Sequence, residues 1–279
     1  MPEVKAKDHI FNAEATVLSG NLTLPVKQTI EPQAHSKLDP SGGYFNQTSD
    51  GYALQSIISF DHAYSHVAGN KSLKDGEGWN TLTTTVVEGL NVMEVVTADR
   101  VVGQTITHHP LVGHMPSISF LGTRYENLRI AGIPVELEWD QEIYTLTPEN
   151  DLAYALDPGL ISRAGRQYSA ILQNKNLSPK LQKHYNQLSK ALGVSETIEC
   201  SLVNRVAGLF PGTIAGNVIS IPGFGSITLG KVTVKHESPL DATKTYKKTT
   251  FTLTMIDLNL GCVIEGDVPI GTGGSNGTH

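Results

Sequence analysis

The sequence predicts a mainly β fold, an antiparallel β-sandwich or flattened barrel with a helical insertion. Apolar and β-branched residues alternate with polar ones along most of the chain, which is the periodicity of a strand. Clusters of Gly, Pro, Asn, Asp and Ser interrupt these runs at short intervals, as turns between strands do. The apolar spacing becomes helical only near Thr147. We therefore expect a single β-rich domain over residues 1–279, with the helical insertion at residues 147–193.

Four strand regions are expected before the insertion. Residues 31–51 read as a loop, because they contain the turn-forming sequences Asp39-Pro40-Ser41-Gly42-Gly43 and Ser49-Asp50-Gly51. Within the third strand region, Gly89 marks a turn or a bulge. The fourth region has apolar residues on one face and acidic residues on the other, which predicts a half-buried strand. The expected strands are residues 15–30, 52–67, 82–107 and 133–146.

The insertion carries the start and stop signals of helices. Thr147 is a capping residue, Pro148 suits the first helical position, and Pro158 then interrupts the pattern. A further helix begins at Ser178-Pro179 and ends at Gly193. Its apolar stripe has helical spacing and consists of Leu181, Tyr185, Leu188 and Leu192. We expect a helical hairpin or three-helix unit whose stripe packs on the sheet.

Strands resume after the insertion and end in a polar tail. Over residues 249–266 the apolar positions change from odd to even numbers at Met255-Ile256, which predicts a β-bulge. Residues 271–279 are rich in Gly, Ser and Asn, so we expect a flexible tail.

Charge and hydropathy exclude two classes of partner. The net charge of −6 argues against a nucleic-acid-binding protein, because such proteins need clustered Lys and Arg. No stretch approaches the roughly 18 consecutive apolar residues of a membrane span. Residues 1–9 are charged and no apolar run follows them, so no signal peptide is recognisable. Whether a signal peptide or an anchor was removed stays open.

The two cysteines, Cys200 and Cys262, each lie in an alternating segment at an inward position. Two buried free thiols and one disulfide between late strands are both compatible with this pattern. A disulfide also requires an oxidising compartment. We predict that both cysteines are buried, and whether they form a disulfide is left open.

Two blocks of turn and strand sequence carry a resemblance. The first runs from Gly89-Leu90-Asn91-Val92 through Val96-Thr97-Ala98-Asp99 to Phe120 and residues 127–135. The second comprises Ile221-Pro222-Gly223-Phe224-Gly225-Ser226-Ile227-Thr228-Leu229 and the closing strand at residues 252–266. Together they cover about half of the chain, and they resemble the bacterial choice-of-anchor P group of surface proteins.

The resemblance implies a secreted, β-rich protein of the cell surface or envelope. The group has no established activity, so no catalytic residues carry over from it. This chain departs from the group's pattern in having no visible signal peptide, no anchor, and the helices between Thr147 and Gly193.

Histidines are the first candidates for a site. His62 and His66 flank Tyr64, so in a strand the three side chains share one face. A second group surrounds the turn residues Pro110 and Gly113. Some of these imidazoles together with Asp61 could bind zinc, copper or nickel. Exposed histidines on a polar face are the simpler interpretation, and we predict no tightly bound metal and no cofactor. The candidate ligands are His62, His66, His108, His109 and His114.

Other catalytic patterns are weaker. Glu136, Glu138 and Asp140 could supply the paired carboxylates of a glycosidase, but they alternate on one strand face and read as solvated. Gly223-Phe224-Gly225-Ser226 is not a nucleophile elbow, because the final glycine is missing.

The insertion has the one charge asymmetry of the chain. Its helical part contains six basic residues and no acid: Arg163, Arg166, Lys175, Lys180, Lys183 and Lys190. A solvated outer face explains this, and a basic surface for an acidic partner is the alternative.

The sequence favours a non-catalytic structural or binding module, extracellular or in the cell envelope. Self-association and an envelope polymer are the candidate partners, and neither nucleic acid nor a membrane span is expected. The alternative is an enzyme with a pocket between the insertion and the sheet, metal-dependent through histidines in one version. Polar side chains that converge in a concave pocket there would indicate a ligand site. Exposed edge strands would favour assembly or adhesion.

Overall fold

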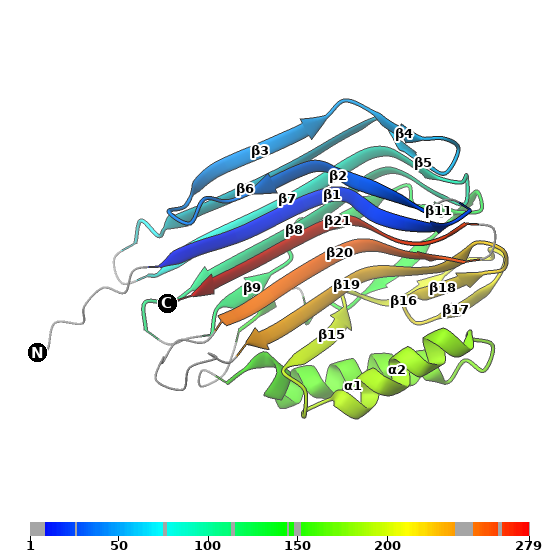
Figure 1. Cartoon of the computed structure of the whole chain (residues 1–279). Coiled ribbons are helices and arrows are strands. Elements are labelled where there is room, and N and C mark those ends of the chain that lie inside the picture. Colours follow the sequence, from blue (N-terminus) through cyan, green and yellow to red (C-terminus); the bar gives the residue numbers. More distant parts are fainter. Residues whose placement is uncertain are drawn as a thin grey trace, which may run out of the picture.

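In a computed structural model, the described residues are 9–25, 27–74, 77–112, 115–143, 145–147, 152–237, 248–261 and 264–278. Within them, the protein has two large antiparallel sheets, a two-stranded sheet and two α-helices (Figure 1). Sheet A has eight strands: β17 (Thr213–Ala215), β18 (Val218–Ile221), β19 (Gly225–Glu237), β20 (Lys248–Leu260), β21 (Glu265–Thr278), β1 (Ile10–Leu24) and β2 (Gln28–Lys37) in spatial order, with β15 (Thr197–Ser201) beside β19.

Sheet B has eleven strands among the described residues. Its centre is the pair β7 (Trp79–Val92) and β8 (Val96–His109), flanked by β6 (His62–Lys71) and then β3 (Gly43–Ser49). The shorter strands are β4 (Tyr52–Leu54), β5 (Ile58–Phe60), β9 (Ser117–Ser119), β10 (Arg124–Glu126), β11 (Arg129–Ile130), β12 (Ile133–Pro134) and β14 (Thr145–Leu146). A separate pair is formed by β13 (Glu136–Trp139) and β16 (Val203–Ala207). The mainly β fold predicted from the sequence is confirmed as an open sandwich with a helical insertion.

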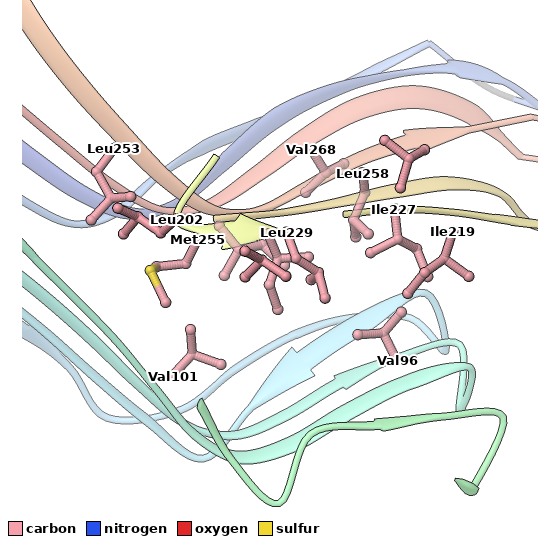
Figure 2. Packing of buried hydrophobic residues seen from close by; sticks show 14 of the residues in the cluster. Val96, Val101, Leu202, Ile219, Ile227, Leu229, Leu253, Met255, Leu258 and Val268 are labelled. Carbon is pink, nitrogen blue, oxygen red and sulfur yellow. The ribbon is translucent and has the colours of Figure 1, made fainter. Parts of the chain in front are cut away.

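The two large sheets pack face to face, with β1, β20 and β21 over β6, β7 and β8. Met255 of sheet A points toward Val101 of sheet B, and Ile219 and Ile227 of sheet A lie across from Val96 (Figure 2). Each sheet supplies one apolar face to a shared core.

Part of the sheet-to-sheet contact is made by small residues. Thr83, Thr85 and Thr107 of sheet B are buried, and the hydroxyls of Thr107 and Ser275 lie 2.9 Å apart. Opposite them, a Cβ atom added to Gly273 would lie 2.7 Å from Thr83 Oγ1. The prediction of a flexible tail at residues 271–279 is therefore wrong for residues 271–278. Their glycines let the backbone of β21 approach the facing threonines.

Sheet A bends where its inward positions change from odd to even numbers. In β20 the inward residues are odd up to Met255 and even from Ile256, as the sequence indicated. The pairing of β20 shows no register shift there, so the predicted bulge is wrong. Instead, Gly230 and Gly271 lie beside Met255 in the adjacent strands, with φ of +60° and +65°. The strands of sheet A bend about midway along their length (Figure 1).

Several predicted boundaries change. The expected loop at residues 31–51 contains the end of β2 and all of β3. Residues 82–107 form the predicted strands β7 and β8, whereas residues 133–146 form only short strands. Gly89 has a φ of +65° but causes no register shift with β8.

The insertion consists of η1 (Tyr154–Leu156), α1 (Pro158–Leu172) and α2 (Pro179–Ala191). Pro158 begins α1 instead of interrupting a helix, because Asp157 caps it by accepting a hydrogen bond from the Leu160 amide at 2.6 Å. The predicted helix start at Pro148 lies outside the described residues. Ser178 caps α2 as predicted. Neither α-helix of the described chain is long and apolar enough to span a membrane.

Candidate functional site

A cavity of about 220 Å³ lies between α2 and the outer face of sheet A. This is the position where a convergent polar pocket would indicate a ligand site. Its wall comes from five elements: α2 with its capping residue, β15, β19, β20 and β21. The lining residues are Ser178, Lys180, Leu181, His184, Tyr185, Glu199, Ser226, Thr228, Lys231, Asp257, Asn259 and Asp267.

The pairing of β19, β20 and β21 brings together the polar strand residues that line the pocket. Ser226 on β19 is paired with Asn259 on β20, and Asn259 is paired with Asp267 on β21. One step along, Thr228 is paired with Asp257. Residues directly opposite in a sheet have Cβ atoms about 5 Å apart, so these side chains form two adjacent polar rows.

Charged and polar groups in the pocket are connected in pairs. Lys231 forms an ion pair with Asp257, and both side chains are about a quarter exposed. Lys180 Nζ donates to Asn259 Oδ1 at 2.8 Å, and Asn259 Nδ2 donates in turn to the Asp267 carboxylate. This network joins α2 to β20 and β21.

A second pair lies on the helix side. His184 Nε2 is 3.6 Å from Glu199 Oε1, and the His184 side chain is half exposed. The pair connects α2 to β15. Its separation is longer than a hydrogen bond, so the two groups are positioned near one another with room for a small adjustment.

Two buried tyrosines support the pocket. The Tyr168 hydroxyl donates to the backbone carbonyl of Glu199, and its ring centroid is 5.9 Å from that of Tyr185. Burial raises the pKa of both tyrosines well above the ordinary value of 10. Their hydroxyls therefore stay protonated at neutral pH and act as fixed structural groups.

Chemically, the pocket offers both donors and acceptors to a small polar ligand. Two lysines, Lys180 and Lys231, stand beside three carboxylates, and His184 adds an imidazole whose nitrogens can donate or accept a hydrogen bond. The lysine charges are already engaged by Asn259 and Asp257. Recognition here would depend on directional hydrogen bonds more than on net charge.

The predicted histidine ligands lie elsewhere and apart. His62, Tyr64 and His66 do share the outer face of β6, as predicted. His62 Nδ1 is 3.0 Å from Asp50 Oδ1, and the His66 ring packs edge-on against Tyr44. Burial lowers the pKa of His66.

The second histidine group is divided between the two faces of β8. His108 Nδ1 is 2.8 Å from Asn80 Oδ1 on the outer face, whereas His109 is buried with its ring 4.8 Å from that of His9. His114 lies outside the described residues. Across the described part of the chain, no three His, Cys, Asp or Glu side chains are grouped closely enough to hold a metal ion.

Cys200 is buried, as its alternating segment predicted. Cys262 lies outside the described residues, so its burial and the disulfide stay predictions. Burial raises the pKa of the Cys200 thiol to about 12.

Two basic residues of the insertion have polar partners outside it, and the others are exposed: Arg166, Lys175, Lys183 and Lys190. Arg163 lies 3.4 Å from Asp140 and also contacts Glu142, so part of the acidic strand face is neutralised by α1. Lys180 enters the pocket.

The apolar stripe of α2 packs on the core, as predicted. Its fully buried member is Tyr185, and the partly buried members are Leu181, Leu188 and Leu192. The helix therefore uses this face for the protein's own interior.

The pocket residues of the strands were not recognised from the sequence. Glu199, Lys231, Asp257, Asn259 and Asp267 occupy outward positions of alternating strands, where polar side chains are ordinary. One sequence feature could have pointed to them. The apolar stripe of α2 was expected to pack on a sheet, so α2 had to cover some outward-facing positions of the strands.

A protein-family model described as "Domain of unknown function (DUF8256)" matches residues 9–235. The matched range includes the insertion and most of the pocket, and it ends in β19 before Asp257, Asn259 and Asp267. No curated protein and no solved structure matches the chain.

Proposed function

We propose that this chain, which belongs to the DUF8256 family, is a non-catalytic binding module that holds a neutral sugar unit of an envelope polymer in the pocket beneath α2. The observation that carries the proposal is the convergence of paired polar groups from α2, β15, β19, β20 and β21 on one small cavity. Binding sites are typically concave, with a few convergent polar groups that fix ligand orientation.

A neutral sugar fits the chemistry of the pocket. Each sugar hydroxyl can donate and accept a hydrogen bond, and the cavity offers carboxylates, amines, an amide and hydroxyls close together. Its volume of about 220 Å³ suits a single small polar unit. An ionic ligand would have to displace Lys231 from Asp257, or Lys180 from Asn259, before it gained a partner.

Placement at the cell surface or in the envelope is part of the proposal. It is supported by the resemblance of the two sequence blocks to a group of bacterial surface proteins. A polymer of the envelope would present many copies of the same sugar unit, so a weak single site would gain from multivalent attachment.

An enzyme acting in the same pocket is the second candidate. The observation that favours it is the proximity of His184 and Glu199, since a carboxylate beside an imidazole can orient it as a general base. The two candidates differ in turnover, because a binding module releases its ligand unchanged.

The test is calorimetric titration of the full chain with neutral oligosaccharides built from glucose, galactose, mannose or N-acetylglucosamine. We expect saturable binding to at least one of them and at least a tenfold loss of affinity in Asn259→Ala, which breaks the link between Lys180 and Asp267. Asn186→Ala is the matched control, because Asn186 is exposed on α2 and does not line the pocket.

Absence of saturable binding by every oligosaccharide, or equal binding by both variants, would contradict the proposal. Time-dependent cleavage of a bound oligosaccharide that is lost in His184→Gln would establish the enzyme instead.

A further inference from the structure

The strand β3 forms an open edge of sheet B. Among the described residues it pairs only with β6, from Gly43 with Gly69 to Ser49 with Ala63. It runs along the outermost border of the sandwich (Figure 1). An unpaired edge presents a row of backbone donors and acceptors to any extended segment that approaches it.

Nothing in β3 protects this edge. Its seven residues, Gly43–Ser49, include no charged residue and no proline, and its pairing with β6 has no register shift. Six of the seven are exposed. Edge strands of soluble proteins are normally blunted by charge, proline, a bulge or short length.

The other edges do carry such protection. The opposite sheet ends in β2, which contains Glu31 and Pro32 and has Ala34 at a φ of +43°. The strand β17 has three residues, β12 has two and ends in Pro134, and β15 carries Glu199. Within the described residues, β3 is thus distinguished as an edge that is both long and unprotected.

Two aromatic side chains project from β3. Tyr44 is 65% exposed and Phe45 is 43% exposed, and as neighbours in a strand they lie on opposite faces. Phe45 is on the inner face, paired with the buried Val67, and is only partly covered. A strand added at this edge would shield both rings from water.

We propose that β3 pairs antiparallel with β3 of a second copy of the chain, which joins the two B sheets into one continuous sheet across a twofold axis. A twofold axis makes the two edges antiparallel, and an isologous contact needs a self-complementary surface. In the register centred on Asn46, Tyr44 faces Thr48 of the second copy and Phe45 faces its Gln47. Aromatic residues opposite β-branched ones are favourable cross-strand pairs.

The absence of charged residues makes β3 a strand edge at which two copies can meet without opposing like charges. Each chain carries a net charge of −6, so most surfaces of two copies repel one another. Self-pairing through β3 brings no charged side chain opposite its own copy, because the strand contains none. A seven-residue strand contact is small compared with a permanent interface, so the dimer should depend on protein concentration.

Sedimentation velocity of the full chain over a range of concentrations tests the proposal. We expect a monomer–dimer equilibrium that Asn46→Lys shifts at least tenfold toward monomer, because the substitution places two ammonium groups opposite each other at the axis. Gln28→Lys is the matched control, since it adds the same charge at an exposed position of the edge strand β2. Circular dichroism checks that both variants stay folded.

A second variant tests the register. Asn46→Cys places the two new thiols opposite each other, with Cβ atoms about 5 Å apart, so oxidation should give a covalent dimer on a non-reducing gel. Thr48→Cys should cross-link far less, because its opposite residue is Tyr44. A wild-type protein that is monomeric at every concentration, or a dimer that Asn46→Lys leaves unchanged, would overturn the proposal.

Discussion

Replacing Tyr185 with alanine removes the one side chain of α2 that is fully buried. It is 4% exposed and packs against Tyr168 on the outer side of sheet A. An aromatic side chain buries about 150–250 Å², which at about 25 cal/mol per Å² corresponds to an upper bound of about 4–6 kcal/mol. Comparable substitutions in cores cost about 3–5 kcal/mol, so we expect a loss in this range.

Two milder variants calibrate the loss. Leu188→Ala should cost about 1–2 kcal/mol, because Leu188 is only partly buried. Tyr185→Phe keeps the ring and removes only the hydroxyl, which lies near Thr228 in the wall of the pocket. It should cost no more than about 1 kcal/mol, the usual net contribution of one hydrogen bond.

The assay is urea denaturation followed by far-ultraviolet circular dichroism, with hydrogen exchange of the α2 amides measured on the same variants. If Tyr185 anchors the helix, Tyr185→Ala lowers the free energy of unfolding and accelerates exchange across α2. A loss below about 1 kcal/mol with wild-type exchange would refute the anchoring role. A stable Leu188→Ala protein that changes its oligomeric state would show that the stripe of α2 serves a partner instead.

The remaining predictions concern burial and packing. Iodoacetamide at pH 8 should leave Cys200 unmodified in the native protein and modify it after denaturation, as peptide mapping by mass spectrometry would show; rapid native labelling would contradict its burial and its pKa of about 12. Because burial raises the pKa values of Tyr154, Tyr168 and Tyr185, their contribution to stability is complete below about pH 10 and is lost as the pH rises above it, since unfolded tyrosines ionise there. Absorbance at 295 nm should show these three ionising only as the protein unfolds, and their titration in the folded state would count against this account. Gly273→Ala should lower the free energy of unfolding by about 1–3 kcal/mol, because the new methyl group would lie 2.7 Å from the hydroxyl oxygen of a facing threonine; an unchanged midpoint in urea would show that the sheets can separate at little cost.

The sequence predicted the elements whose pattern is strong over many residues. β7 and β8 could be predicted because both are long runs rich in Val and Thr, although the turn between them lies at residues 93–95 and not at Gly89. The stripe of α2 was predicted for the same reason, since Tyr185 and Leu188 repeat at helical spacing. In both cases the signal is local.

The errors arose in segments whose composition suggests flexibility or a local irregularity, but whose structure is set by contacts with distant parts of the chain. Gly273 and Ser275 look like part of a flexible tail, yet between two sheets their small size allows close approach to Thr83 and Thr107. Met255 showed a real change of phase, but the conformational adjustment lies in glycines of the neighbouring strands, which one strand's sequence does not reveal.

The sequence indicated where a pocket could lie, between the insertion and the sheet, but not which residues line it. Lys180, Glu199 and Asp267 come from segments that are joined only by helix docking and long-range strand pairing. Each of them alone is an ordinary solvated residue. Their convergence depends on the register of β19, β20 and β21, which is set by contacts between residues far apart in the chain.

The position of β21 in sheet A has a consequence for how the protein is made. The strand lies between β20 and β1, and it pairs Thr278 with Ile10. A chain emerging from the ribosome holds β1 with β2 as its only strand neighbour in the described sheet until residues 265–278 are synthesised. At about 5–20 residues per second, the stretch from Leu24 to Thr278 takes roughly ten to fifty seconds. During that interval β1 has an open side that its own chain cannot yet fill, so protection by chaperones would matter most before β21 is synthesised.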